Sequence, residues 1–203
     1  MSSEIHFPAP QPLYRLNARH FRHIGGLASD MGGSLEFAHT DICRRGFVQR
    51  LGNRDGRRAY RILEPVISAS STFLKKAEQV EVARKEVKPG FCLRFPGWHT
   101  DGSSKTIIIR DTLLTKFVIG SIDIEHPVAK AMATCNDDFR PETRDAFSSA
   151  VDLAILEGDL QLFDEIEPFT AFGFTNRHVH EAQTNSTRQA VNTCMVKMSS
   201  RTA

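Results

Sequence analysis

Residues 91–110 read FCLRFPGWHTDGSSKTIIIR and set the pattern for the rest of the chain. Phe91–Phe95 has the composition of a short strand that stops at Pro96-Gly97, and Thr106–Ile109 has that of a second strand. The second run does not alternate between apolar and polar residues, so we expect it to be buried on both faces. The linker between the two carries a histidine and an aspartate two residues apart, His99 and Asp101.

The chain is β-rich from about Val87 onward. Further strands are expected at Leu113–Ile122, Phe169–Val179 and Thr187–Met198. One helix interrupts them, beginning at Pro141 and ending at Gly158, because proline favours a first helical turn and glycine a helix end.

The residues before Val87 have a mixed pattern. Phe7–Leu16 is expected to be extended or loop chain, and Gly52–Gly56 to be a turn. Ser70–Glu86 is expected to contain a helix. Helices followed by mostly antiparallel strands predict a mainly β fold with flanking helices, of the jelly-roll type.

Length and composition indicate one ordinary globular domain. The 203 residues suffice for a single core, so we expect one domain over 1–203, with a helical and mixed segment at 1–86 packed on a β core at 87–203. The hydrophobic content of 40% and the charged content of 25% are typical of soluble proteins. The net charge of +2 is too small to indicate a nucleic-acid partner.

Basic residues do gather between Arg44 and Arg58. We expect a solvated face there. The alternative is that an anionic substrate or carrier docks on it. Aromatic residues are not interleaved with the arginines as a nucleic-acid stacking surface would need, so no nucleic-acid partner is expected.

The cysteines and the N-terminal segment favour a cytoplasmic setting. Cys43, Cys92, Cys135 and Cys194 are far apart, without a C-x-x-C spacing for zinc, so reduced thiols are expected. Met1–Pro12 is polar and proline-rich and lacks the apolar segment of a secretory signal. No apolar run approaches the 18 or so residues of a membrane helix, so no membrane association is expected.

Two pairs of residues have the spacing of metal ligands on a strand. His99 and Asp101 are separated by one residue, as are His178 and His180, and side chains at i and i+2 of an extended chain point to the same side. Two imidazoles and one carboxylate form the facial triad of non-haem iron(II). By strand parity, either His178 or His180 can supply the second imidazole. Arg188, at the start of the last expected strand, can hold a carboxylate bidentately beside the metal.

The order of these motifs resembles the iron(II)/2-oxoglutarate-dependent oxygenase superfamily. The resemblance lies in Gly97-Trp98-His99-Thr100-Asp101-Gly102, in Val179-His180-Glu181-Ala182, and in Arg188, and it covers about Phe91–Ser199. It implies a double-stranded β-helix and an enzyme that uses iron(II), 2-oxoglutarate and dioxygen to hydroxylate, desaturate or cyclise a small organic substrate, releasing succinate and carbon dioxide.

The resemblance also implies roles for single residues. His99, Asp101 and His180 would bind the metal, with His178 as the fallback third ligand, and Arg188 would pair with the far carboxylate of 2-oxoglutarate. Halogenating relatives lack the carboxylate ligand, so the presence of Asp101 favours the other oxidations.

Three more residues are candidates for supporting roles. Thr115 is a candidate for cofactor binding, and Arg110 for cofactor or substrate binding, although either can be an ordinary strand residue. Trp98, beside the expected ligands, is a candidate substrate wall or an ordinary packing residue.

Two other functions remain compatible with the sequence. One is a cupin-like metal enzyme that does not use 2-oxoglutarate; such sites typically use more histidines and a glutamate. The other is a non-catalytic jelly-roll module that binds a carbohydrate or a partner protein. The substrate and the oligomeric state cannot be predicted from the sequence.

Overall fold

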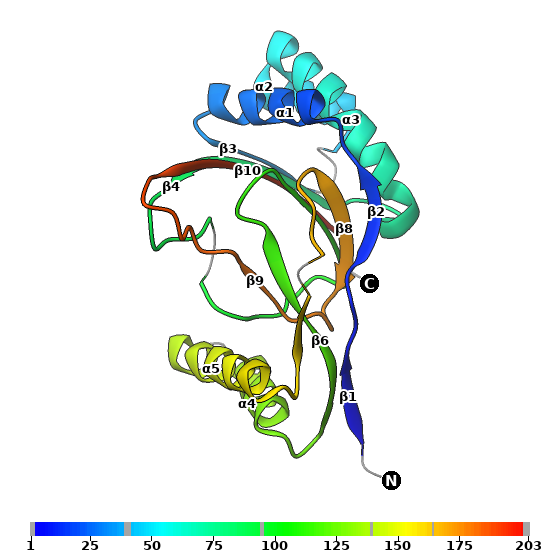
Figure 1. Ribbon diagram of the computed structural model, residues 1–203. Helices are drawn as coiled ribbons and strands as arrows, with labels where there is room; N and C mark the ends of the chain where they lie inside the picture. Colours follow the sequence, from blue (N-terminus) through cyan, green and yellow to red (C-terminus); the bar gives the residue numbers. More distant parts are fainter. Residues whose placement is uncertain (1–2, 39–41, 94–95, 139, 164, 201–203) are drawn as a thin grey trace.

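The computed structural model describes residues 3–38, 42–93, 96–138, 140–163 and 165–200. Two antiparallel sheets face each other, and helices cover the outer side of each (Figure 1). The strands are β1 (Glu4–Phe7), β2 (Gln11–Arg15), β3 (Ser34–Ala38), β4 (Gln79–Val87), β5 (Lys105–Arg110), β6 (Thr115–Asp123), β7 (Gln161–Phe163), β8 (Thr170–Thr175), β9 (His180–Ala182) and β10 (Val191–Ser200). The helices are α1 (Ala18–Asp30), α2 (Arg44–Leu51), α3 (Asn53–Leu74), α4 (Pro127–Asp137) and α5 (Pro141–Glu157).

The strand order confirms the predicted mainly β, jelly-roll fold with flanking helices. The larger sheet has six strands in the order β2-β8-β5-β10-β4-β3. The smaller sheet has four, with β6 between β1 and β7 and also paired with β9. Every strand pair within the described residues is antiparallel.

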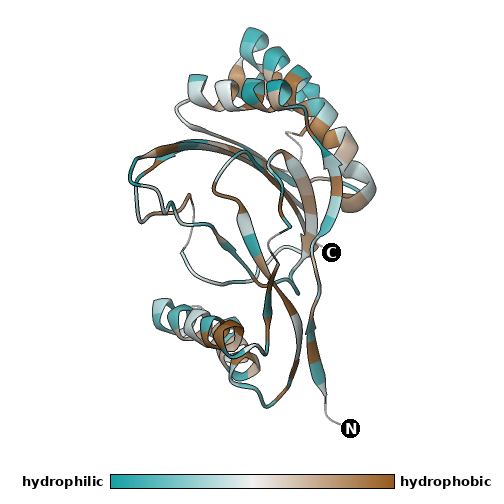
Figure 2. Cartoon of the chain, viewed as in Figure 1, coloured by the Kyte–Doolittle hydropathy of each residue, from teal (hydrophilic) through white to brown (hydrophobic). Residues whose placement is uncertain are grey.

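Three hydrophobic clusters fill the spaces between these layers. The largest lies between α1–α3 and the six-stranded sheet and includes Phe21, Leu63 and Val196. A second, with Phe147, lies between α4–α5 and the four-stranded sheet. The third, with Phe117, lies between the two sheets. The helices of the first layer carry both hydrophilic and hydrophobic residues (Figure 2), and their buried apolar side chains belong to the first cluster. The third cluster is the part of the core next to the predicted ligand His180, whose ring lies close to those of Phe117 and Phe174.

The second half of the chain follows the predicted pattern closely. The strands expected at Leu113–Ile122 and Thr106–Ile109 correspond to β6 and β5, and the helix that begins at Pro141 is α5, which Gly158 ends in a left-handed conformation. The expected strand at Phe91–Phe95 is not found at Phe91–Leu93, and its last two residues lie outside the described residues.

At Phe7–Leu16 the chain is extended, as one of the two expected alternatives, and contains the end of β1 and all of β2. The first half differs from the prediction in two places. The expected turn at Gly52–Gly56 is the start of α3, because only Gly52 has a positive φ and the chain is helical from Asn53. The helix expected at Ser70–Glu86 ends at Leu74, and β4 follows. The mixed segment at 1–86 therefore contributes β2, β3 and most of β4 to the larger sheet.

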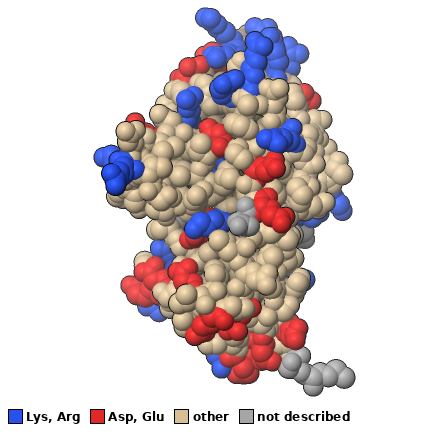
Figure 3. Space-filling model, viewed as in Figure 1, with Lys and Arg blue, Asp and Glu red and all other residues tan. Residues whose placement is uncertain are grey.

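Charge is distributed unevenly between the two ends of the molecule. Basic side chains gather over α1–α3 and acidic side chains over α4–α5 (Figure 3). The arginines between Arg44 and Arg58 are exposed on α2 and α3, as expected for a solvated face. Among the helices that the structure describes, none has the length and apolar character needed to cross a membrane.

Candidate metal centre

Three of the predicted metal-binding residues converge on one point. One ligand atom each from His99, Asp101 and His180 lies within 4.8 Å of the other two. The Nε2 atom of His180 is 3.9 Å from Oδ1 of Asp101, and the two imidazole rings have centroids 4.4 Å apart. These are separations that a single metal ion can bridge, given bonds of about 2 Å from a metal to imidazole nitrogen or carboxylate oxygen.

Backbone pairing holds the two histidines in register. His99 and His180 form an antiparallel bridge, in which each N–H donates to the other's carbonyl oxygen at 2.9 Å. His180 is also the first residue of β9 and pairs with Phe117 of β6. The main-chain positions of the two imidazole ligands are therefore fixed by pairing with each other and with β6.

Hydrogen bonds select the imidazole tautomer that a metal needs. Nδ1 of His99 lies 3.0 Å from the carbonyl oxygen of Gly97, and Nδ1 of His180 lies 3.3 Å from that of His178. A carbonyl can only accept, so each Nδ1 must carry the proton. Each Nε2 then keeps its lone pair for a metal, as second-shell contacts commonly arrange for histidine ligands.

Helix α5 anchors the turn that carries His99. The Trp98 indole N–H donates to Oδ1 of Asp152 at 2.7 Å, and its backbone N–H donates to Oγ of Ser148 at 3.1 Å. Gly97 has a φ of +82°, and a Cβ there would lie 2.8 Å from Oγ of Ser148, so a side chain is excluded on both grounds. Trp98 is only 3% exposed and belongs to the cluster around Phe147, which places it as a packing residue rather than a cavity wall.

Burial and charge set the ionisation of the site. Burial lowers the pKa of His180 to about 3, with His99 and Lys197 acting in the same direction and Asp101 opposing them. Burial alone would raise the pKa of Asp101, but the neighbouring His180 and Lys197 lower it below its ordinary value. At neutral pH the site therefore presents a neutral His180 imidazole and an ionised carboxylate, which are the forms that bind metals.

The three ligands open onto a cavity of about 220 Å³ between the two sheets. Arg110 at the end of β5 and Thr115 at the start of β6 line it and are 5% and 3% exposed. One guanidinium nitrogen of Arg110 donates to the Leu113 carbonyl oxygen at 2.8 Å. The Thr115 hydroxyl is buried and has no hydrogen-bond partner among the described residues. This hydroxyl is therefore available to hydrogen-bond a polar ligand in the cavity.

Sequence reasoning missed Lys197, which also lines this cavity. Its Nζ lies 3.0 Å from Oδ1 and 2.8 Å from Oδ2 of Asp101. The contact to Oδ2 is an ion pair without hydrogen-bond geometry. The alternation of side chains along the last strand could have indicated it, because Met195 and Lys197 are two residues apart and point to the same face of β10.

Besides Trp98, two predicted residues lie outside this cavity. His178 does not belong to the converging group; its Nε2 lies 3.3 Å from the carbonyl oxygen of Ala9, and burial lowers its pKa. Arg188 is exposed in the segment between β9 and β10, because the last strand begins only at Val191, and it does not line the cavity.

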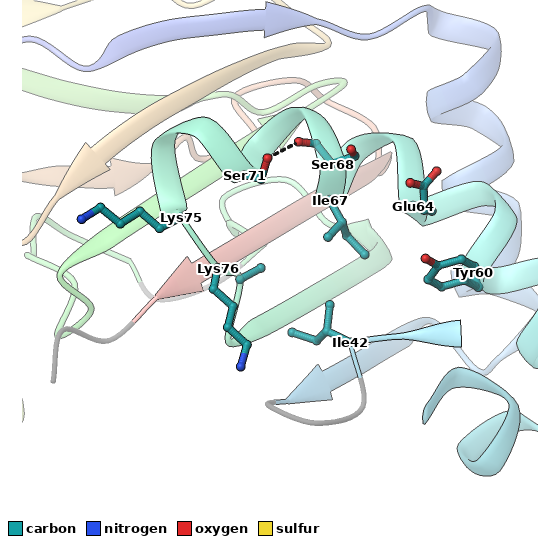
Figure 4. A pocket seen from close by; sticks show the side chains of 9 residues that line it. Ile42, Tyr60, Glu64, Ile67, Ser68, Ser71, Lys75 and Lys76 are labelled. Atoms are coloured by element: carbon teal, nitrogen blue, oxygen red, sulfur yellow. Dashed lines mark hydrogen bonds between the residues drawn. The ribbon is translucent and has the colours of Figure 1, made fainter. Parts of the chain in front are cut away.

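A further cavity of about 290 Å³ lies in the helical layer (Figure 4). It is bordered by Tyr60, Glu64, Ser68 and Ser71 of α3 and by Lys75 and Lys76 beyond it. Its lining includes one carboxylate and neither histidine nor cysteine, so it offers no comparable set of metal ligands. The convergent chemistry lies in the cavity between the sheets.

The sequence matches no protein-family model and no curated protein. Several solved structures resemble this chain. AviO1 from Streptomyces viridochromogenes Tue57 is 12% identical with a TM-score of 0.49, over 100% of this chain and 91% of that chain. SnoN, a non-heme alpha ketoglutarate dependent epimerase from nogalamycin biosynthesis, is 13% identical with a TM-score of 0.46, over 98% and 77%. A Pseudomonas putida prolyl-4-hydroxylase is 10% identical with a TM-score of 0.36, over 93% and 98%.

Proposed function

We propose that this protein is an iron(II)- and 2-oxoglutarate-dependent oxygenase that hydroxylates or otherwise oxidises a small organic substrate. The observation that carries the proposal is the convergence of two imidazoles and one carboxylate within 4.8 Å, beside a cavity that also contains buried cationic and hydroxyl groups. Three protein ligands on one side of an iron(II) ion leave positions open for other molecules.

The donor set fits iron(II) better than it fits the cupin-like alternative. His99 and His180 supply neutral nitrogens and Asp101 a charged oxygen, a combination of two histidines and one carboxylate. A cupin-like site would use more histidines and a glutamate. No further histidine or glutamate joins this group among the residues that the structure describes.

Arg110 and Thr115 are suited to hold 2-oxoglutarate. When bound, iron(II) and 2-oxoglutarate supply the oxidising chemistry with dioxygen and yield succinate and carbon dioxide. Arg110 offers a buried guanidinium for the far carboxylate, and the Thr115 hydroxyl can donate to the same group. This assignment replaces Arg188 as the anchoring arginine, because Arg188 is exposed and Arg110 lies inside the cavity.

Aromatic rings exclude water from one side of the centre. The rings of Phe174 and Phe117 have centroids 4.8 Å and 5.6 Å from that of His180, and both are buried. Dry surroundings strengthen the electrostatic contacts of the site and limit side reactions with water. Lys197, held on Asp101, keeps that carboxylate in place.

Turnover of 2-oxoglutarate without added substrate tests the proposal. Purified protein is supplied with iron(II), ascorbate, oxygen and 2-oxoglutarate, and succinate is quantified. We expect slow, iron-dependent succinate release. Arg110→Met should raise the KM for 2-oxoglutarate at least about tenfold, since it removes a charge-assisted hydrogen bond. Arg188→Ala is the matched control and should leave that KM unchanged.

Other outcomes separate the alternatives. Bound iron without any succinate release would favour the cupin-like enzyme. Failure to bind iron at all would favour the non-catalytic jelly-roll module. If Arg188→Ala raised the KM and Arg110→Met did not, Arg188 would be the anchor after all.

A further inference from the structure

A larger cavity opens beside the metal centre. It measures about 490 Å³, against about 220 Å³ for the cavity that contains the three ligands. Thr100 lines both cavities and lies between His99 and Asp101 in the sequence, so one end of the larger cavity lies next to the chain segment that carries two of the proposed metal ligands. We call this larger cavity the β1 groove; its walls are β1, α4 and the turn at Asn176-Arg177.

The walls of the β1 groove are fixed by contacts distant in sequence. β1 pairs with β6 from Glu4↔Asp123 to Phe7↔Gly120. Beyond β1, Nε2 of His178 lies 3.3 Å from the carbonyl oxygen of Ala9 and ties the N-terminal segment to the turn after β8. The groove is therefore a preformed feature of the fold, as small-molecule sites usually are.

The lining of the groove combines an apolar wall with a polar edge. Ile5, Phe7 and Met132 supply apolar surface from β1 and α4. Asn176 and Arg177 supply amide and guanidinium groups from the turn on the other side. The chemistry fits a ligand with an apolar body and hydrogen-bonding groups along one edge.

Arg177 supplies the guanidinium group of the groove lining. Its side chain is exposed, and no carboxylate lies within ion-pair distance of it in the described stretches of the chain. Glu4 lines the same groove but makes no such pair with it. A guanidinium in a cavity wall, free to form two parallel hydrogen bonds, favours a planar oxoanion.

We propose that the β1 groove binds the organic substrate, and that this substrate has an apolar body and an oxoanion held by Arg177. The inference rests on the proposed function, since it takes the adjoining triad to be the oxidising centre. The carbon to be oxidised then lies at the Thr100 end of the groove, and the oxoanion lies at the Arg177 end. The groove is the larger of the two cavities, so it has room for a substrate larger than 2-oxoglutarate.

Paramagnetic broadening by manganese(II) tests this placement without turnover. The protein is loaded with manganese(II) and saturating 2-oxoglutarate, and biphenyl-4-carboxylate is titrated while its ring protons are followed by NMR. We expect saturable broadening of those protons in the wild-type protein. Arg177→Gln should weaken the affinity about tenfold or more, because a charge-assisted bidentate contact is lost. Met132→Trp should fill the groove and abolish the broadening.

Arg61→Gln is the matched control, since Arg61 is an exposed arginine of α3 that does not line the groove. The affinity of this variant for the probe should stay within about twofold of that of the wild-type protein. The groove assignment alone is overturned if manganese(II) binds but the probe is not broadened, or if Arg177→Gln and Met132→Trp behave as wild type. If manganese(II) does not bind to the wild-type protein, the proposed function fails and this inference fails with it.

Discussion

One face of the six-stranded sheet packs against the helices, and the other lines the cavity of the metal centre. Both faces are represented in the single strand β10. Cys194, Val196 and Met198 point toward the helical layer and belong to its hydrophobic cluster. Met195 and Lys197 point the other way and line the cavity of the metal centre. Side chains alternate along a strand, so one segment can stabilise the fold with one face and serve the site with the other. A shift of one residue in the register would exchange the two roles.

The largest expected effect is on metal binding, in the cavity lined by Met195 and Lys197. Asp101→Ala should weaken manganese(II) binding by at least about 100-fold, because it removes the only charged ligand of the triad. The fold should persist, since Asp101 belongs to none of the three hydrophobic clusters. Isothermal titration calorimetry measures the affinity, with Asp30→Ala, on the exposed Asp30–Arg58 pair, as control. Equal affinities of the two variants would contradict the assignment of Asp101.

On the face of the sheet that packs against the helical layer, a substitution should lower stability and leave metal binding unchanged. Met198→Ala removes a fully buried side chain from the helical-layer cluster and should lower the free energy of unfolding by about 2–5 kcal/mol. The manganese(II) affinity of the folded protein should not change. Urea denaturation and calorimetry on the same sample measure the two quantities. A loss of metal affinity without a loss of stability would mean that the two faces are not separate.

An intermediate effect is expected where α5 meets the metal centre. Asp152→Ala deprives the buried Trp98 indole of its hydrogen-bond acceptor and should cost about 1–3 kcal/mol of stability. Metal affinity should also fall, by about tenfold, because the turn before His99 loses its anchor. Asp152→Asn keeps an acceptor oxygen and should restore much of the affinity. If Asp152→Asn behaved like Asp152→Ala, the anchoring role of this hydrogen bond would be wrong.

The smallest perturbation uses two cysteines and leaves the chain unchanged. Burial, with Asp111 adding to it, raises the pKa of Cys194 to about 12, whereas Cys43 is exposed on the rim of the helical layer. At about pH 8 iodoacetamide should alkylate Cys43 and spare Cys194, since only the thiolate reacts. Mass spectrometry of the digested protein measures both. Rapid labelling of Cys194 in the folded protein would show that the outer face of β10 is accessible.

The raised pKa of Cys194 also makes the stability of the protein depend on pH. The pKa of Cys194 is higher in the folded state than its ordinary value of 9.0, so the folded state favours the protonated thiol. The stabilisation from this group is complete below about pH 9 and is lost as the pH rises toward 12. Denaturation curves in alkaline buffer should show this loss for wild type and not for Cys194→Ala.

Local pattern predicted the second half of the chain better than the first. The apolar run of β5 and the proline and glycine that bound α5 are strong local signals, and both elements lie where expected. At Gly52–Gly56 the glycines favoured a turn, but α2 and α3 pass so closely that a Cβ at Gly56 would lie 2.4 Å from the Phe47 carbonyl oxygen. Gly56 is therefore a packing residue inside a helix, which no local rule reveals.

Local sequence patterns likewise predicted only part of the candidate site. The H-x-D spacing and strand parity anticipated the convergence of His99, Asp101 and His180, and left His178 open because both histidines have the same parity. The structure separates them by their contacts, since His178 reaches Ala9 instead. Arg188 was expected at the start of the last strand, but that strand begins at Val191, so Arg188 lies outside the cavity, which Arg110 of β5 lines.

The contact between His178 and Ala9 also bears on how the molecule assembles. The two residues are separated by 169 positions, and β1 reaches β6 across more than a hundred. Contacts of such high sequence separation require closure of long loops and slow the folding of β proteins. During synthesis β1 has no partner until β6 has emerged from the ribosome. The helical layer has the same dependence, because its cluster includes Val196 and Met198 of β10, which follows β6 in the chain. Neither the wall of the β1 groove nor the largest part of the core can therefore be completed early in synthesis.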